Sequence, residues 1–456
     1  MQIVRQSKYR HIFGTAFKNE LTYQDLKFAS TAWDPCDFIR ANATFFAIPW
    51  QSGGGGSMAV IKHSDTGKAR PDTPVLTGHR AQILDFDFNP FNDFILATGS
   101  EDCTVKVWGI PQEGLTQTID TPLVSLDAHG RRVGIVRFHP TASNVLTTVG
   151  LDHKLKLWDI EEVACKSVVE GFGDTVQSLD YNLDGSLMVV TSKDKTVRIV
   201  DPRDKNFVSE APGHQGFKGS RVVWMKRKDI IVTFGFSRTS ERQYFVWDPK
   251  QMEKPLETMD IDQSSGVLMP FYDEDTGVLY VAGKGDGNIR FYEYTEKMYF
   301  LNEFKTSSPQ RGMTMMPKLA LDTQICETTR FLKLENHSVT PIMFQVPRKS
   351  EIFQEDIYPD TFAPEPTATS EEYFSGVAHP PKDISMRPED RKETTTAPKM
   401  SDFKPKVEYK EPEKLPPKST DPKTLMAQND ELRSRIQNLE MENETLRKKL
   451  ADAGLD

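Results

Sequence analysis

Alternating apolar and polar residues recur along the first three quarters of the chain, each time after a short polar turn. The segments SEDCTVKVWGI, GLDHKLKLWDI and SKDKTVRIVDP share this pattern. In the first of them Val105 and Val107 fall on one face of an extended chain, and the intervening Lys106 falls on the other. A period of two residues predicts β-strands, so this part of the chain is expected to consist of sheets.

A polar signature recurs together with these strands. Asp102 follows His79 by 23 residues, and Trp108 follows Asp102 by six. The residues that close successive units, at positions 108, 158, 200, 247 and 292, are 42 to 50 residues apart. That spacing is typical of WD-type propeller blades, which repeat every ~40–45 residues and tolerate loop insertions. The recurring set comprises His79, Asp102, Trp108, His129, Asp152, Trp158, Asp194, His214, Trp247 and Asp286.

We interpret this set as structural rather than catalytic. The aspartate of each unit is expected in a tight turn, where it accepts hydrogen bonds from backbone or imidazole N–H groups. The tryptophan and histidine can share a hydroxyl group on the neighbouring strand, such as that of Thr98 or Ser100. Buried polar atoms need such partners, and the same set occurs once per repeat, which an active site would not.

The repeats predict an all-β, seven-bladed WD-repeat β-propeller over residues 1–346. Five units span residues 75–297, and the strand-like segments at 30–70 and 300–346 extend the count to seven blades. Closing a ring requires its two ends to meet. We therefore expect a strand near residues 3–13 to pair into the last blade and cover its edge.

Two segments with different composition follow the propeller. Residues 347–366 contain several large apolar side chains, among them Ile352, Ile357 and Tyr358, and are expected to pack on the propeller as an extension. Residues 367–424 are rich in proline and intermixed charges and poor in aliphatic residues. Such a segment buries too little apolar surface to offset its ordering entropy, so we expect a flexible linker.

Residues 425–456 carry a heptad pattern that predicts a coiled coil. Arg435 and Glu440 flank an a/d pair in the arrangement R-h-x-x-h-E, which is typical of short parallel trimers. Asn429 and Asn443 fall at a positions and favour dimers, so trimer is preferred and dimer stays open. An amphipathic helix folded onto the propeller is the alternative. The core positions include Leu425, Leu432, Ile436, Leu439, Leu446 and Leu450.

Composition and charge exclude several classes of function. The 456 residues carry 57 Lys and Arg against 66 Asp and Glu, a net charge of −9, which argues against general nucleic-acid binding. No stretch approaches ~18 consecutive apolar residues, so no transmembrane helix is expected. The N-terminus lacks the apolar run of a secretory signal, although a transit peptide is an open alternative to a strand there.

No motif in the chain predicts an enzyme or a cofactor. The four cysteines, Cys36, Cys103, Cys165 and Cys326, are far apart, which is typical of core thiols in a reducing cytosol. The run Gly53–Gly56 lacks the Gly-Lys-Ser/Thr that completes a phosphate loop. The acidic segment that starts at Asp273 lacks the glutamate of a calcium loop, since the corresponding position is Lys284. We therefore expect no enzyme, no cofactor and no metal.

The sequence as a whole resembles the coronin family of actin-binding WD-repeat proteins. The resemblance covers most of the chain, and Phe172 and Val200 depart from the repeat signature where His and Trp are expected. The most specific segments are LMPFYDEDTGVLYVAGKGDGNIRFYE, PQRGMTMMPK and VPRKSEIFQEDIYPDTFAPEP. Further matches are QSKYRHIFG, FNPFND, GSEDCTVKVWGIP, SKDKTVRIVDPR and FGFSRTSERQ.

The resemblance implies an F-actin-binding and crosslinking protein of the cytoplasm and cell cortex, with a homo-oligomeric coiled coil. It also implies regulation of the branch-nucleating complex of actin-related proteins and cooperation with cofilin. The family's actin contact corresponds to Lys27 in YQDLKFAS, and residues 1–30 also carry Arg5, Lys8 and Arg10 in an otherwise acidic chain. Such a basic patch suits the acidic surface of a filament. A WD-repeat scaffold for another cytosolic complex is the alternative function.

Overall fold

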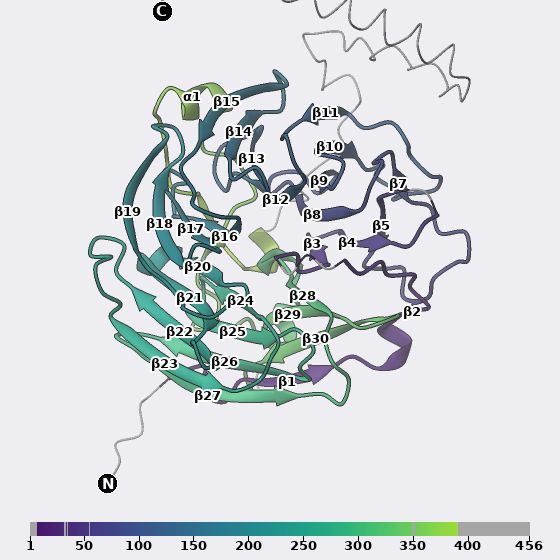
Figure 1. Cartoon of the computed structure of the whole chain (residues 1–456). Coiled ribbons are helices and arrows are strands. Elements are labelled where there is room, and N and C mark those ends of the chain that lie inside the picture. Colours follow the sequence, from purple (N-terminus) through teal and green to yellow (C-terminus); the bar gives the residue numbers. More distant parts are fainter. Residues whose placement is uncertain (1–6, 32, 34, 54, 349–351, 391–456) are drawn as a thin grey trace, which may run out of the picture. The chain divides into compact units, whose positions relative to one another are not determined.

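A computed structural model describes residues 7–31, 33, 35–53, 55–348 and 352–390. Seven sheets, antiparallel except for one parallel pair of short strands in the last blade, follow one another around a ring, and a two-stranded ribbon lies outside them (Figure 1). The predicted seven-bladed propeller is confirmed. Arg5, the linker beyond residue 390 and the coiled coil at 425–456 lie outside the described residues.

Blades 1 to 6 each consist of a four-stranded sheet. The strands of blades 1 to 3 are β3 Arg40–Ala41, β4 Phe45–Trp50, β5 Ser57–Lys62, β7 Leu76–Thr77, β8 Ile83–Phe88, β9 Ile95–Ser100, β10 Thr104–Gly109, β11 Val124–Asp127, β12 Val133–Phe138, β13 Val145–Gly150, β14 Leu155–Asp159 and β15 Ala164–Val169. Those of blades 4 to 6 are β16 Val176–Tyr181, β17 Met188–Ser192, β18 Thr196–Asp201, β19 Asn206–Pro212, β20 Arg221–Met225, β21 Ile230–Phe236, β22 Arg242–Trp247, β23 Glu257–Asp262, β24 Leu268–Asp273, β25 Val278–Gly283, β26 Asn288–Tyr294 and β27 Met298–Lys305.

Blade 7 joins the two ends of the ring. Its β28, β29 and β30 come from the end of the propeller sequence, and β1 from the N-terminal segment pairs antiparallel with β30. Phe13 of β1 lies opposite Gln345, and Tyr23 of β2 lies opposite Val339. The bounds are β1 Phe13–Ala16, β2 Tyr23–Gln24, β6 Gly67–Lys68, β28 Gly312–Met315, β29 Glu327–Leu334 and β30 Val339–Gln345. Short 3₁₀ helices are η1 Asn19–Leu21, η2 Lys226–Lys228, η3 Lys318–Ala320, η4 Thr323–Ile325 and η5 Pro388–Asp390.

The N-terminal strand lies later in the sequence than the expected 3–13. Residues 8–11 form a turn, after which the Ile12 N–H donates to the Tyr9 carbonyl at 3.1 Å. Tyr9 and Ile12 are both buried in the core between blades 6 and 7. Residues three apart face the same side of a turn but opposite sides of a strand, so burial of both side chains favours the turn.

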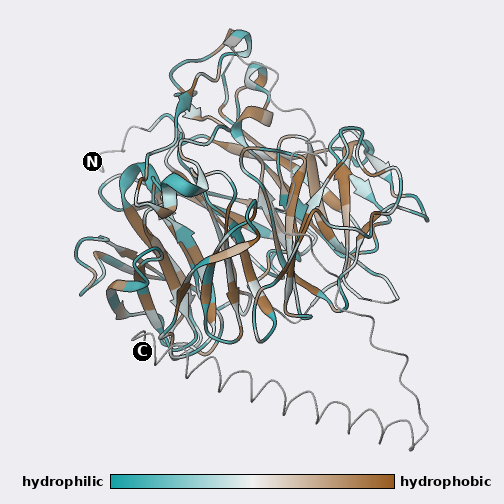
Figure 2. Cartoon of the chain, turned by 90° about the horizontal axis from the view of Figure 1, so that it is seen from above, coloured by the Kyte–Doolittle hydropathy of each residue, from teal (hydrophilic) through white to brown (hydrophobic). Residues whose placement is uncertain are grey.

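Each strand buries side chains against two neighbouring blades. Val105 and Val107 of β10 are fully buried against Val133 and Val136 of the next blade. Trp108, on the other face of β10, packs into the core of the preceding blade. The apolar residues consequently concentrate in the strands and the polar residues in the loops (Figure 2).

The ring has two faces that differ in the loops they carry. Because the first strand of each blade runs from one face to the other, the loop before it and the turn after it lie on opposite faces. We call the face with the loops before the first strands, which hold His79, His129 and His214, the GH face. The turns between second and third strands lie on the same face. The opposite face, with the turns between first and second strands, is the extension face.

Residues 352–390 cross the extension face. The Thr367 N–H donates to the Thr141 carbonyl at 2.8 Å, and Tyr358 Oη donates to the Glu327 carbonyl at 2.8 Å. β31 (Thr361–Phe362) pairs with β32 (Asp383–Ile384) to form the ribbon, and α1 (Ser370–Phe374) lies between them in sequence. Ile357 and Tyr358 are buried here, whereas Ile352 is 77% exposed.

The structure corrects the start of the predicted flexible linker, because residues 367–390 pack on the propeller. Tyr373 of α1 is fully buried with its ring 4.3 Å from that of His139, and its hydroxyl donates to the Gly185 carbonyl at 3.3 Å. Ala368 and Met386 are buried as well. A few well-placed apolar side chains therefore order a segment whose overall composition is that of a linker.

Replacing Tyr373 with alanine should release α1 from blades 3 and 4. Removal of a buried aromatic ring costs about 3 kcal/mol or more, which corresponds to roughly a hundredfold more frequent opening of the segment. Hydrogen exchange at the Thr367 amide measures this opening. Glu371→Ala, an exposed change in the same helix, is the control, and equal protection in both variants would refute the anchoring role of Tyr373.

Candidate functional site

The recurring polar set forms hydrogen-bonded networks under the GH face. His79 Nδ1 lies 3.0 Å from Asp102 Oδ2, and its Nε2 lies 2.8 Å from Thr98 Oγ1. Trp108 Nε1 donates to the same Thr98 oxygen at 2.8 Å. Since an ionised carboxylate only accepts, Nδ1 of His79 is the donor to Asp102 and Nε2 accepts from the threonine hydroxyl. The network ties the loop before blade 2 to two of its strands.

Blade 3 repeats this geometry. His129 lies 3.0 Å from Asp152 and 2.9 Å from Thr148, to which Trp158 Nε1 also donates at 2.9 Å. Burial lowers the pKa of His129 to about 4, more than the nearby carboxylate of Asp152 raises it. A histidine that stays neutral and bonded through both ring nitrogens suits a structural role better than proton transfer near pH 7.

Blade 4 preserves the aspartate with a different partner. Arg198 pairs with Asp194 at 2.8 Å, and its guanidinium lies 5.9 Å from the ring of Phe172. Phe172 stands where the repeat expects histidine, so an arginine above an aromatic ring replaces the imidazole. Blade 5 lacks the aspartate, yet His214 and Trp247 still share the hydroxyl of Thr233, at 3.1 Å and 3.0 Å.

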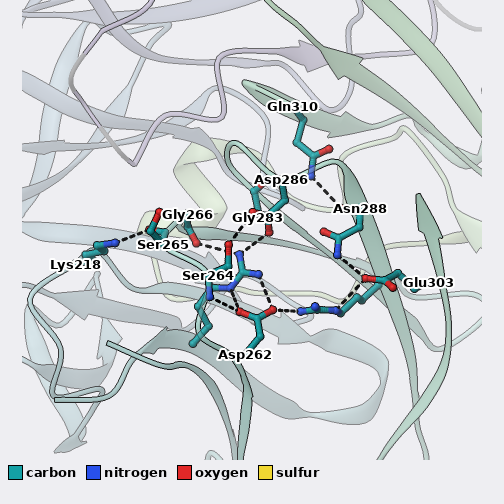
Figure 3. A network of polar contacts seen from close by, with 12 residues as sticks. Lys218, Asp262, Ser264, Ser265, Gly266, Gly283, Asp286, Asn288, Glu303 and Gln310 are labelled. Atoms are coloured by element: carbon teal, nitrogen blue, oxygen red, sulfur yellow. Dashed lines mark hydrogen bonds and ion pairs between the residues drawn. The ribbon is translucent and has the colours of Figure 1, made fainter. Parts of the chain in front are cut away.

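Figure 3 shows the polar network around Asp286. This network depends on Arg242, which sequence analysis did not identify as a site residue. Arg242, from β22, is 1% exposed and donates to Asp286 at 2.6 Å across the boundary between blades 5 and 6. It also makes two hydrogen bonds of 2.6 Å to Asp262 at the end of β23. Ser264 Oγ also donates a hydrogen bond to Asp286 Oδ1 at 3.0 Å. The one sequence signal is that Asp286 lacks a preceding Gly-His pair.

The same network extends along the GH face. Burial raises the pKa of Asp262, but hydrogen bonds from Arg242 and Arg290 outweigh this effect and hold the pKa below its ordinary value. Gln310 donates to the Asn288 carbonyl at 2.9 Å, so the contacts reach the loop before blade 7 (Figure 3). The loops of three successive blades are thereby fixed relative to one another.

Lys27 lies on the GH face. The Leu26 N–H donates to the His337 carbonyl in the turn between β29 and β30, and Gln51 donates to the Lys27 carbonyl. The Lys27 side chain is exposed, and its ammonium reaches the Pro71 carbonyl at 3.0 Å. An ammonium has three donors, so most of its hydrogen-bonding capacity faces solvent.

Lys8 and Arg10 lie on the opposite face, although the sequence suggested one basic patch. Both are exposed, and Lys8 Nζ donates to the Asp356 carbonyl of the extension at 2.9 Å. β1 starts opposite Gln345 and the chain reaches Val339 at Tyr23, six residues along β30. At ~3.4 Å per residue this is about 20 Å, so the chain crosses from one face to the other between the two groups.

Other exposed cations accompany Lys27 on the GH face, and sequence analysis missed them. They lie in the loops before first strands or in the turns between second and third strands. The position of a residue within the sequence repeat therefore indicates which face of the ring it lies on. Phe217, in the loop before β20, is 86% exposed, and Lys195 Nζ lies 5.0 Å from its ring. The exposed cations are Arg80, Arg131, Arg132, Lys193, Lys218, Arg238 and Arg311.

The extension face carries a cavity of about 540 Å³ between the propeller and the ribbon. Arg40, Asp87 and Arg137 line it from the propeller, and Pro364 and Ile384 line it from the ribbon. Within the part of the chain described, no group of three or more His, Cys, Asp or Glu side chains is arranged to hold a metal ion. Nor does any described helix have the length and apolar character needed to cross a membrane.

Family profiles match most of the propeller. Residues 72–109, 120–159 and 164–201 match a WD domain, G-beta repeat, and residues 339–381 match a type of WD40 repeat. Residues 2–68 match a domain of unknown function.

Several relatives match over most of the chain. Coronin-A of Dictyostelium discoideum is 44% identical over 444 residues, 97% of each chain. Human Coronin-2A is 39% identical over 394 residues, 84% of this chain and 75% of the relative. A crystal structure of the WD40 domain of Toxoplasma gondii coronin superimposes with a TM-score of 0.79 at 32% identity and covers 83% of this chain and 98% of that one.

Replacing Arg242 with methionine should destabilise the propeller by about 3–5 kcal/mol, because Asp262 and Asp286 lose a largely buried counter-ion. Denaturant unfolding at neutral pH measures the loss. Since the pKa of Asp262 is lowered in the fold, the stabilisation is present above the ordinary pKa of an aspartate and is lost only as the pH falls below it. The exposed Arg238→Met is the control, with a change under ~0.5 kcal/mol. A loss of similar size in both variants would contradict the assigned role.

Proposed function

The chain belongs to the coronin family, and we propose that it binds actin filaments through the GH face of its propeller. Coronins are WD-repeat proteins of the actin cytoskeleton without catalytic activity, and this chain is accordingly not an enzyme. The observation that carries the proposal is that Lys27 and further exposed cations from the loops of several blades lie on one face of a molecule with a net charge of −9. Complementary charge orients a partner and raises the rate of encounter with an acidic filament.

Phe217 supports the same face. Lys195 Nζ lies 5.0 Å from its exposed ring, so the loop before blade 5 offers an aromatic side chain with a cation beside it. Aromatic and cationic side chains carry a large share of binding energy in many protein interfaces. Lys218 Nζ also donates to the Ser265 carbonyl at 2.6 Å, which links this loop to the network of Arg242 (Figure 3).

A coiled coil at 425–456 would convert weak single contacts into collective binding. Two or three propellers tied together meet successive subunits of one polymer at high effective concentration, which raises the apparent affinity without any new contact. The same linkage allows one oligomer to hold two filaments and crosslink them. The trimer remains preferred over the dimer on the heptad pattern.

Two further partners are proposed from the family resemblance alone. We expect the chain to modulate the branch-nucleating complex of actin-related proteins and to act with cofilin at the cell cortex. A WD-repeat scaffold for another complex is the competing function. Co-sedimentation with purified filaments at low and raised salt separates the two, because a charge-steered filament binder weakens as salt rises.

The charge reversal Lys27→Glu should weaken filament binding by roughly tenfold, through loss of an attractive contact and gain of a repulsive one. Co-sedimentation over a range of actin concentrations gives the dissociation constant. Lys8→Glu is the matched control, since it makes the same change in charge on the extension face. The proposed face is wrong if Lys8→Glu weakens binding and Lys27→Glu does not.

Removal of residues 425–456 should weaken apparent filament affinity by a factor between about 10² and 10⁴ and abolish bundling. Co-sedimentation and light scattering of the filament suspension measure the two effects. Fusion of an unrelated parallel dimeric coiled coil in place of these residues should restore much of the affinity. A truncated chain that bundles as well as the full chain would exclude the avidity mechanism.

A further inference from the structure

Arg227 clamps the ribbon of the extension onto the propeller. Its guanidinium donates to Asp383 of β32 at 2.6 Å and 3.2 Å and to the Asp360 carbonyl at 3.2 Å. The same group lies 4.3 Å from the ring of Phe362 in β31. One side chain, from η2 in the first turn of blade 5, therefore holds both strands of the ribbon.

The adjoining turn of blade 6, Asp273-Glu274-Asp275, contacts the turn that carries Arg227. Glu274 accepts hydrogen bonds from the backbone N–H groups of Lys226 and Arg227, at 2.8 Å and 3.0 Å, and so fixes the turn that carries the clamp. The side chain of Asp275 is 5% exposed, and its Oδ2 has no hydrogen-bond partner.

Burial leaves these two carboxyl groups short of compensating charge. It raises the pKa of Glu274 to about 7, despite the Lys226 ammonium and the two backbone N–H groups. Burial also raises the pKa of Asp275, with Asp273 adding to the effect, while Lys318, Thr361 and Arg227 oppose it.

The other charged groups around this cluster are already paired. Each neighbouring cation pairs with a carboxylate outside the two invoked here, and Arg227 in addition lies 4.0 Å from Asp275. The aromatic hydroxyl groups nearby carry no charge near pH 7. The pairs are Lys226 with Asp180, Lys318 with Asp273 and Arg227 with Asp383, and the hydroxyl groups are those of Tyr9 and Tyr272.

We propose that docking of the ribbon is linked to protonation of Glu274 and Asp275, so that the extension is held more tightly at pH 6 than at pH 8. Protonation removes the free-energy cost of a buried charge beneath the ribbon. It also makes the Asp275 carboxyl group neutral, so that its Oδ2, which has no hydrogen-bond partner, no longer belongs to a buried anion. At higher pH the ionised pair favours the open turn, where water solvates it.

The direction follows from linkage. A carboxyl group with a raised pKa in the docked state binds more protons there than in the released state, so docking strengthens as the pH falls toward the ordinary pKa of a glutamate. For Glu274, whose pKa is about 7 in the docked state, the upper limit is a roughly tenfold change in the opening equilibrium between pH 6 and pH 8, which requires the released carboxyl to be fully solvated with a pKa of ~4.3.

Release of the ribbon would uncover a defined site. Pro364 and Ile384 line one side of the cavity of about 540 Å³. When the ribbon leaves, this side of the cavity opens to solvent. The proton-linked clamp therefore controls how widely the cavity opens on the extension face.

Hydrogen exchange on the full chain tests the proposal, with rates at pH 6 and pH 8 corrected for the intrinsic dependence on pH. The reporters are the amides of Ala363, bonded to the Lys382 carbonyl, and Thr367, bonded to the Thr141 carbonyl. We expect the ribbon to open up to about tenfold more often at pH 8. Glu274→Gln combined with Asp275→Asn should remove the difference and keep both amides protected. Glu371→Gln, a change at an exposed position of α1, is the control and should retain the pH dependence.

Three results would overturn the proposal. The first is a ribbon in the unmodified chain that opens equally at both pH values. The second is a double variant that keeps the pH dependence, which would assign it to another group such as His379. The third is a double variant whose ribbon is unprotected at both pH values. The neutral amide side chains mimic the protonated carboxyl groups, so the proposal requires them to keep the ribbon docked. Asp275→Asn alone, which leaves the Glu274 hydrogen bonds intact, repeats the test with less disturbance of the turn.

Discussion

Pairing of β1 with β30 is the contact on which the ring depends. Six blades complete their sheets with strands from nearby sequence, but blade 7 has only β28, β29 and β30 until the N-terminal segment joins it. The pairing covers an otherwise open edge and brings the two ends of a long β-structure together. It also determines on which face Lys8 and Lys27 lie. The N-terminal segment starts beside β30 at the extension face and ends beside it at the GH face.

The polar networks show how one structural requirement is met by different residues. In blades 2 and 3 a histidine holds the turn aspartate, whereas in blade 4 Arg198 does so. Between blades 5 and 6 Arg242 satisfies two aspartates at once. In each case a buried or partly buried carboxylate is paired, because leaving it unpaired would cost several kcal/mol. The firmly held loops then present their exposed cations in fixed positions.

Sequence patterns predicted the propeller because its signals are local and repeated. The spacing of His79, Asp102 and Trp108 reflects one blade and recurs with little change. The role of Arg242 could not be predicted, since its partners lie 20 and 44 residues away on two blades. The same reason applies to Tyr373, whose burial depends on turns of blades 3 and 4 that no local composition reveals. Lys8 and Lys27 are close in sequence, yet the strand between them separates them in space.

The proposed function requires that the GH face contacts the filament. Hydrogen exchange of the full chain, alone and bound to filaments, tests this without any substitution. The account predicts slower exchange in residues 25–31, 78–82 and 213–220 of the bound chain, with little change in the turns beneath residues 352–390. Protection confined to those turns, with the GH face unaffected, would contradict it.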